Sequence, residues 1–297
     1  MEINTQTPLI TKKVIETEKE NKSQQSIPKK NIPIFHYLIL IIFYFIFFTI
    51  IYGITKIYIF NKDQKSFFKI PISIIFYFSS LMIFICHYKS ITTNNSINYS
   101  NINNNILNNH CNKCKIDRPQ RAHHCRICGI CNLKMDHHCP WIINCVGEKN
   151  EKYFFLFLLY SIIGCLISCI LTFDYFLNNF NQSRNFFNQN HIHITFLQIL
   201  FRNFNNSLPV ITFCFSFVFG LSVFIILYIN FIHIKIGLTT IEMEIYGNNL
   251  CDCPYYNENW KENLIKLFGN EPLKMFLPFE KSINQIDLLE NDYIALK

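Results

Sequence analysis

Apolar residues gather in four long stretches that contain no Asp, Glu, Lys or Arg. Each stretch is close to the roughly 20 residues that an α-helix needs to cross the hydrocarbon core of a bilayer. Helices buried in a soluble core seldom run uncharged over such lengths. Pro71 and Pro209 lie one residue inside the second and fourth stretches, where a helix tolerates a missing N–H, and Ser207 can cap the fourth. The pattern therefore predicts four transmembrane helices, which are Ile34–Ile54, Ile70–Tyr88, Tyr153–Phe173 and Leu208–Ile232.

Composition agrees with a membrane protein. Half of the 297 residues are apolar and 31 are Phe, yet 16% are charged, so the apolar residues must be clustered along the chain. The first 31 residues are polar and mix Lys with Glu, so we expect no cleavable signal peptide and a short disordered tail. The predicted fold class is a mainly α, polytopic membrane protein with a small cysteine-rich domain between helices 2 and 3.

The distribution of Lys and Arg predicts the orientation. With four crossings, segments 1–33, 89–152 and 233–297 share one side and hold 21 Lys and Arg, whereas 55–69 and 174–207 hold six. The positive-inside rule then makes the first side cytosolic, although four lysines crowd the short loop 55–69. The net charge of +7 is interpreted as an orientation signal and an attraction to anionic lipids. The Asn-rich tracts 94–109 and 178–190 are typical of linkers.

This orientation gives five regions. We expect a cytosolic tail, a first pair of helices, a cytosolic linker with a cysteine-rich domain whose core is 111–150, a second pair of helices joined by a lumenal loop, and a cytosolic C-terminal region. Their bounds are 1–33, 34–88, 89–152, 153–232 and 233–297.

Seven of the 13 cysteines fall in the window Cys111–Cys145, together with four histidines, His123, His124, His137 and His138. Cytosolic thiols are kept reduced, so Cys-x2-Cys spacing there favours metal binding over disulfides. Reduced cysteines that bind nothing are the alternative, but so polar a loop offers no apolar core for seven thiols. Cys125, Cys128 and Cys131 form two overlapping pairs, and Cys128 cannot serve both. The spacing thus indicates two interleaved Zn²⁺ sites with eight ligands, and leaves their pairing open.

Three runs in this window resemble the cysteine-rich domain of DHHC-type protein S-palmitoyltransferases. They are Arg118 to Cys125 (RPQRAHHC), Met135 to Trp141 (MDHHCPW), and Asn144 to Gly147 (NCVG) with Asn150. The resemblance implies a first zinc held by Cys111, Cys114, His124 and Cys131, and a second held by Cys125, Cys128, His138 and Cys145. Both sites would be closed, with four protein ligands each, so both zincs are expected to be structural.

Cys139 is left without a metal and lies next to His137 and Asp136. A thiol beside an imidazole is a means of forming a thiolate nucleophile at neutral pH. We predict Cys139 as nucleophile and acyl carrier, His137 as general base, and Asp136 as the group that orients His137. Alternatively, Cys139 or His137 is a zinc ligand, and Asp136 is an acceptor for a metal-bound histidine.

The segment after the fourth helix carries two further elements of the resemblance. Thr239, Thr240 and Glu242 match a TTxE element, in which the Thr240 hydroxyl is expected to reach Asp136, unless the run is an ordinary helix cap. Trp260, Asn263 and Gly269 match a C-terminal motif. Pro254 stands where relatives usually have Asn, which puts hydrogen bonds of that motif in doubt.

The predicted activity is protein-cysteine S-palmitoylation: an acyl group moves from acyl-CoA (palmitoyl-CoA) to Cys139 and then to cysteines of proteins near the bilayer. The partners are therefore protein substrates and the lipid bilayer, and the hosting membrane is an endomembrane (Golgi or ER) or the plasma membrane.

A non-catalytic scaffold would not need Asp136 and His137 beside a spare cysteine. A nucleic-acid binder would need a helix with a basic face. A transporter would place ionisable groups within its helices, which here hold only His36 and His87 near their ends.

Overall fold

Four long helices form the body of the molecule. The structure is a computed structural model that describes residues 32–56, 69–97, 109–190 and 204–280. Within these ranges, four helices are long and apolar enough to cross a membrane, as predicted. They are α2 (Ile34–Ile54), α3 (Lys69–Thr92), α4 (Glu151–Asn190) and α6 (Phe204–Ile236). The predicted fold class is thus confirmed.

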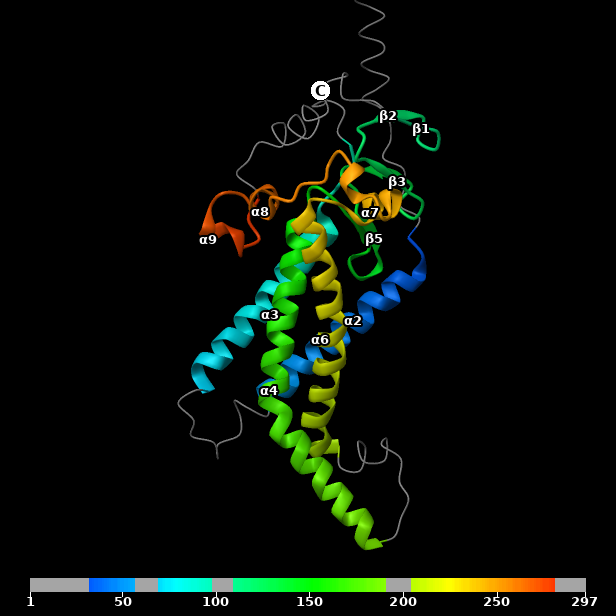
Figure 1. The fold of residues 1–297 in the computed structure, drawn as a ribbon. Helices are drawn as coiled ribbons and strands as arrows, with labels where there is room; N and C mark the ends of the chain where they lie inside the picture. The colour runs from blue at the N-terminus through cyan, green and yellow to red at the C-terminus, as the bar shows by residue number, and fades with distance from the viewer. Residues whose placement is uncertain (1–31, 57–68, 98–108, 191–203, 281–297) are drawn as a thin grey trace, which may run out of the picture.

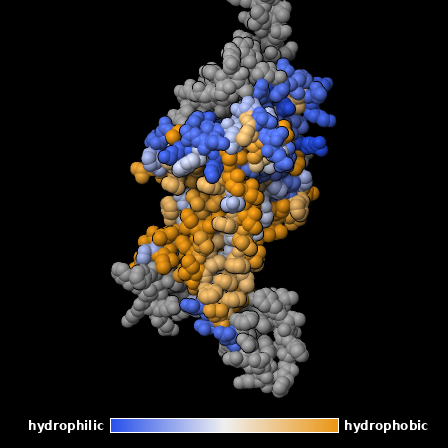
Figure 2. Space-filling model, in the orientation of Figure 1, coloured by the Kyte–Doolittle hydropathy of each residue, from blue (hydrophilic) through white to orange (hydrophobic). Residues whose placement is uncertain are grey.

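Helix α4 lies at the centre of the bundle, between α3 and α6, and α2 crosses α6 obliquely (Figure 1). The buried rings of Phe43 of α2 and Phe157 of α4 meet edge to face, with their centroids 5.7 Å apart. Gly220 lets α6 come close to α4, because a Cβ at that position would lie 2.9 Å from the Cβ of Cys165. Large apolar side chains such as Ile170 and Val218 are exposed and form the belt that lipid would cover (Figure 2).

Helices α3, α4 and α6 all extend beyond their predicted bounds, α4 and α6 the most. Helix α4 continues through the tract 178–190, which its composition assigns to a linker. Extending an existing helix by a turn costs far less than nucleating one, so Asn-rich residues can follow a strong apolar helix. Helix α6 begins at Phe204, which places Pro209 inside the helix and not at its first turn. The predicted capping by Ser207 falls on a side chain outside the described part, and residues 1–31 of the predicted tail 1–33 also lie outside it.

A cysteine-rich domain of three short antiparallel hairpins lies between α3 and α4. The pairs are β1 (Asn109–Cys111) with β2 (Ile116–Arg118), β3 (His123–Cys125) with β4 (Ile130–Asn132), and β5 (His137–Cys139) with β6 (Asn144–Val146). A 3-10 turn, η4 (Pro140–Ile142), follows β5. After α6 come α7 (Thr240–Tyr246), η5 (Leu250–Asp252), α8 (Trp260–Phe268) and α9 (Pro272–Met275).

The hairpins, the start of α2 and helices α7 to α9 all lie at one end of the bundle (Figure 1). Hydrophilic residues cover this end, and an apolar belt follows the helices below it (Figure 2). The cysteine-rich domain therefore lies at the boundary between the hydrophilic end and the apolar belt.

Candidate active site and metal clusters

The first two hairpins use the same turn to bring cysteines together. In the β3–β4 hairpin the Gly129 N–H donates to the Cys125 carbonyl at 2.8 Å, and Gly129 has a φ of 69°. In the β1–β2 hairpin the Lys115 N–H donates to the Cys111 carbonyl at 2.7 Å, with a φ of 54°. Left-handed backbone is disfavoured for lysine, so the first turn is more strained than the glycine-bearing second turn.

Six cysteines and two histidines form two groups within the described residues. One contains Cys111, Cys114, His124 and Cys131, and the other contains Cys125, Cys128, His138 and Cys145. In each group the four ligand atoms lie within 4.8 Å of one another. We call these cluster 1 and cluster 2. They contain the two sets of residues that the family resemblance assigns to the two zincs.

The spacing of the ligand atoms fits a tetrahedral ion. With Zn–S of about 2.3 Å and Zn–N of about 2.0 Å, sulfurs lie roughly 3.8 Å apart and sulfur and nitrogen about 3.5 Å apart. In cluster 1 the sulfurs of Cys114 and Cys131 are 3.7 Å apart. In cluster 2 the sulfurs of Cys128 and Cys145 are 3.6 Å apart, and His138 Nδ1 is 3.4 Å from the Cys128 sulfur. The residues of both clusters can therefore hold zinc.

Strand geometry separates the roles of the adjacent residues in β5. Successive side chains of a strand point to opposite faces, so His137 and Cys139 share one face and His138 has the other. His138 pairs with Cys145 of β6 and turns its ring into cluster 2. Cys139 is 5% exposed, belongs to neither cluster, and packs within the apolar core of the helix bundle. The strand thus carries a metal-binding histidine next to a cysteine that is outside the metal clusters.

Asp136 and His137 form a short ion pair. His137 Nδ1 lies 2.7 Å from Asp136 Oδ2. Burial lowers the pKa of His137, but its hydrogen bonds to Asp136 and Cys139 outweigh burial and raise the pKa to about 10. Burial raises the pKa of Asp136, whereas its hydrogen bonds to His137 and Thr240 lower it to about 2. The carboxylate is therefore charged and holds the imidazole by its Nδ1, which leaves Nε2 available for Cys139.

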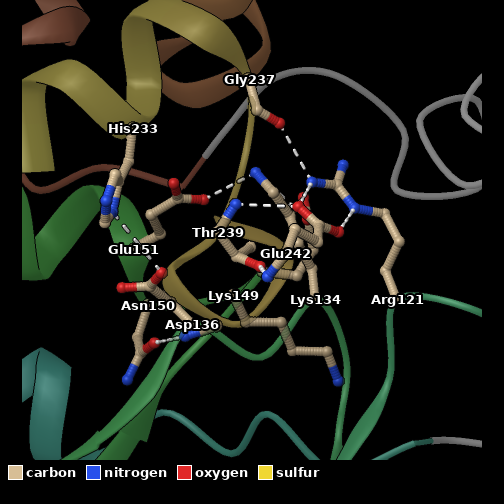
Figure 3. A network of polar contacts seen from close by, with 12 residues as sticks. Arg121, Lys134, Asp136, Lys149, Asn150, Glu151, His233, Gly237, Thr239 and Glu242 are labelled. Carbon is tan, nitrogen blue, oxygen red and sulfur yellow. Dashed lines mark hydrogen bonds and ion pairs between the residues drawn. The ribbon is translucent and has the colours of Figure 1, made fainter. Parts of the chain in front are cut away.

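The second oxygen of Asp136 is held by the segment that follows α6. The Thr240 N–H donates to Asp136 Oδ1 at 2.5 Å, and hydrogen bonds from both the backbone and the side chain of Thr240 lower the pKa of Asp136. His233 Nδ1 lies 3.9 Å from the same oxygen, as the dashed line in Figure 3 marks. Thr239 caps α7: its hydroxyl accepts from the Glu242 N–H, and the Glu242 carboxylate accepts from the Thr239 N–H. The helix-cap alternative thus describes Thr239, whereas Thr240 reaches Asp136.

A buried ion pair joins α7 to the cysteine-rich domain. Arg121 donates from Nε and Nη2 to the two carboxylate oxygens of Glu242, each at 2.7 Å (Figure 3). Arg121 Nη2 also donates to the Gly237 carbonyl at 3.0 Å, and the guanidinium lies 4.5 Å from the ring centroid of Tyr255. Burial raises the pKa of Glu242, but the neighbouring Arg121 charge lowers it overall. The pair fixes α7, and with it the Thr240 N–H that holds Asp136.

Asparagine side chains attach the cysteine-rich domain to the end of α3. Asn144 Nδ2 donates to the carbonyls of Ser90, Ile91 and Thr93, at 3.0, 3.2 and 2.8 Å. Asn150 Nδ2 donates to the Ser90 carbonyl as well, at 3.0 Å. The last carbonyls of a helix have no partner within it, so these amides satisfy them. The NCVG run therefore connects β6 to the membrane bundle.

Two histidines inside the apolar helices, His36 and His87, contact the cysteine-rich domain, which the sequence did not reveal. His87 of α3 is fully buried, and its Nε2 donates to the Trp141 carbonyl at 3.0 Å. Its Nδ1 accepts from the Tyr44 hydroxyl of α2, also at 3.0 Å. A histidine within an otherwise charge-free span was the only available signal. The hydrogen bonds that His87 makes with Tyr44 and Trp141 fix η4, the turn directly after Cys139.

The C-terminal motif also docks on the bundle. Asn263 Nδ2 donates to the carbonyls of Lys235 and Asn257, at 3.0 and 2.8 Å, so this residue keeps hydrogen bonds despite Pro254. Lys152 of α4 is 2% exposed and donates to the carbonyls of Lys274 and Phe279, at 2.9 and 3.1 Å. Helices α8 and α9 are thereby attached to the start of α4.

An apolar pocket lies among the membrane helices. Its lining includes Phe43 and Phe47 of α2, Ile83 of α3, Gly164 of α4 and Phe219 of α6. Phe43 and Ile83 belong to the same buried apolar group as Cys139. The pocket and Cys139 therefore border the same apolar core.

Together, these features define a multi-pass membrane protein whose cysteine-rich domain places two four-residue Cys/His clusters beside an Asp–His–Cys arrangement at the membrane boundary. Residues 104–246 match the DHHC palmitoyltransferase family. This region, just under half of the chain, is similar to that family.

Individual relatives agree. The chain is 47% identical over 68 residues to human "Palmitoyltransferase ZDHHC20" and 54% identical over 68 residues to the bovine protein of that name. Each of these matches covers 23% of this chain and 19% of the relative. It is 30% identical over 191 residues to the Arabidopsis thaliana "Probable protein S-acyltransferase 12", which covers 61% of this chain and 58% of that protein. The matches thus span about a fifth of the mammalian relatives and somewhat over half of the plant one.

Proposed function

We propose that the chain is a protein S-acyltransferase that moves a long-chain acyl group from acyl-CoA to Cys139 and then to cysteines of other proteins. The observation that carries this proposal is the alternation along β5, which places His138 in cluster 2 and leaves Cys139 outside both clusters on the face of His137. A cysteine beside a carboxylate-held imidazole is an activated nucleophile.

In the first step His137 holds the proton that comes from Cys139, and the Cys139 sulfur attacks the thioester carbonyl carbon of acyl-CoA. A new C–S bond forms to Cys139, and the C–S bond to CoA breaks. The leaving CoA sulfur takes the proton from His137, so the products are free CoA and an acyl-enzyme thioester. Asp136 keeps Nδ1 of His137 occupied throughout, which directs the proton exchange to Nε2.

In the second step the thiol of a substrate cysteine gives its proton to His137 and attacks the acyl carbon. The bond to Cys139 breaks, the Cys139 sulfur is protonated again, and the substrate leaves as a new thioester. A thioester is exchanged for a thioester in both steps, so neither step is strongly uphill. Ping-pong kinetics are expected.

The acyl chain is proposed to lie in the apolar pocket among α2, α3, α4 and α6, which adjoins the packing around Cys139. The nucleotide end of acyl-CoA would stay at the hydrophilic end of the molecule. Burial of each CH2 contributes about 0.8 kcal/mol, so a long chain supplies much of the binding free energy.

The two clusters are proposed to hold two structural Zn²⁺ ions, with Cys111, Cys114, His124 and Cys131 as one set of ligands and Cys125, Cys128, His138 and Cys145 as the other. When bound, the ions cross-link hairpins that are too short to fold on their own. The same proposal places Asp136 and Thr240 as positioning residues for His137.

The cysteine-rich domain, the tail and the C-terminal region are proposed to face the cytosol, because the segments on their side of the membrane hold most of the Lys and Arg. The protein partners would then be cytosolic or membrane-associated proteins with cysteines close to the bilayer. An endomembrane or the plasma membrane would host the enzyme.

The test is to incubate purified full-length protein with radiolabelled palmitoyl-CoA and to follow label that neutral hydroxylamine releases. Wild type and a Cys251→Ser control, which changes an exposed cysteine away from the site, should both acquire label. Cys139→Ser should acquire no hydroxylamine-sensitive label. Equal thioester label in Cys139→Ser and wild type would reject the proposed nucleophile.

A further inference from the structure

His36 lies in the first turn of α2 and contacts a residue of cluster 2. Its side chain is nearly buried, with 6% of the residue exposed. Its Nε2 is 3.3 Å from Nε2 of His138, and the two rings meet edge to face with their centroids 5.2 Å apart. The nearest part of the first membrane helix therefore touches the metal-binding histidine from outside the cluster.

The orientation of His138 decides the direction of this contact. Its Nδ1 faces the sulfurs of Cys125, Cys128 and Cys145, at 3.6, 3.4 and 3.7 Å. With Nδ1 on a metal ion, a neutral imidazole carries its hydrogen on Nε2. His138 Nε2 then donates, and His36 Nε2 must accept.

The other nitrogen of His36 shows that this contact has a cost. If Nε2 of His36 accepts, its Nδ1 carries the hydrogen, and this buried Nδ1 has no hydrogen-bond partner among the described residues. A buried donor without a partner is unfavourable, because it loses its hydrogen bonds to water and gains none in the protein. Phe or Leu at this position of an apolar helix would avoid that cost. The hydrogen bond that His36 Nε2 accepts therefore explains the imidazole at this position better than packing does.

We propose that His36 is a positioning residue that accepts the hydrogen bond of the metal-binding His138 and ties the first membrane helix to cluster 2. The proposal rests on the zinc occupancy proposed above and adds an outer partner that the sequence motif does not contain. Such outer partners fix the ring orientation of a histidine ligand, and their loss lowers metal affinity by about 10–100-fold. Because α2 also lines the apolar pocket through Phe43 and Phe47, the same contact connects the wall of that pocket with the metal cluster.

The experiment measures metal and not acyl transfer, so its result is independent of whether the acyltransferase proposal holds. Full-length protein is purified in detergent, its zinc content is determined, and zinc release to a metallochromic chelator is followed for wild type, His36→Phe and His36→Gln. The Phe variant keeps a ring of similar size without an acceptor, and the Gln variant keeps an acceptor at a similar reach. Tyr37→Phe, a half-exposed neighbour on α2, is the matched control.

We expect two zinc ions per wild-type chain. His36→Phe should release one of the two about 10–100-fold faster and the other at the wild-type rate, whereas His36→Gln and Tyr37→Phe should behave as wild type. The proposal would be overturned if His36→Phe released zinc at the wild-type rate, or if it released both ions faster to the same degree. It would also be overturned if His36→Gln released zinc as fast as His36→Phe, or if the wild-type protein contained no zinc. If His36→Phe does not fold, the zinc release rates of His36→Gln and His36→Met are compared, with His36→Met expected to release one ion faster and His36→Gln expected to behave as wild type.

Discussion

Clusters 1 and 2 have the same set of ligand types, three cysteines and one histidine, but very different surroundings. Cluster 1 adjoins the exposed strand β1, and its Cys114 and His124 are partly exposed. The three cysteines of cluster 2 are all buried, and Cys128 and Cys145 are fully so. Cluster 2 also lies on the hairpin that carries Cys139 and contacts α2 through His36. The difference indicates that cluster 2 fixes the site, whereas cluster 1 stabilises the outer part of the domain.

The largest expected effect separates the two clusters directly. Cys145→Ala removes a ligand of cluster 2 from β6, the strand paired with β5. A structural zinc contributes on the order of 10 kcal/mol to the folding of its domain, so we expect acyl-enzyme formation to fall by roughly 10³-fold or more. Cys114→Ala, the matched change in cluster 1, should lose one zinc and lower the rate by only about tenfold. Rates from labelled palmitoyl-CoA and zinc content measure both.

The proposed difference between the clusters would be wrong if Cys114→Ala and Cys145→Ala lowered the acylation rate equally while each lost a single zinc. The two clusters would then support Cys139 to the same degree.

The next effect concerns the link between α7 and the cysteine-rich domain. Arg121→Ala leaves the Glu242 carboxylate buried without its bidentate partner, and removing one member of such a pair costs about 3–5 kcal/mol. We expect a large fall in the free energy of unfolding of purified Arg121→Ala protein. Arg126→Ala, an exposed arginine in the same domain, should change it little. Similar stability of both variants would mean that the Arg121–Glu242 pair does not hold α7 in place.

A smaller effect tests how cluster 2 is attached to the membrane bundle. Asn144→Ala removes donors from carbonyls at the end of α3, which should destabilise the protein by about 1–3 kcal/mol. Asn109→Ala, at the exposed start of β1, should have no such effect. Thermal unfolding in detergent compares them. An Asn144→Ala protein as stable as Asn109→Ala would show that these hydrogen bonds are replaced by water without loss.

Much of this architecture was predictable because its signals are local. A charge-free run of 21 residues predicted α2 with the bounds Ile34–Ile54 that the structure has. The Cys-x2-Cys spacing predicted two interleaved clusters, since two thiols of one turn are close whatever the rest of the fold does. The length of α4 was wrong because a linker composition does not stop a helix that has already formed.

Other features depend on tertiary contacts and could not be predicted. His36 and His87 stand out in the sequence only as polar residues in apolar helices, and their partners His138 and Trp141 are 102 and 54 residues away. The contact of Thr240 with Asp136 was predicted through the hydroxyl alone, whereas the backbone N–H also donates to this carboxylate. A backbone donor is present at every non-proline residue, so residue type cannot identify it.

We propose that β5 directs His138 to a metal ion and leaves Cys139 free to carry the acyl group. The decisive experiment is native mass spectrometry of the detergent-solubilised protein before and after addition of palmitoyl-CoA. We predict two zinc ions before the reaction, and the same two ions plus one palmitoyl group on Cys139 after it. Loss of a zinc ion for each acyl group gained, or an acyl group located on another cysteine, would show that Cys139 is not a metal-free acyl carrier.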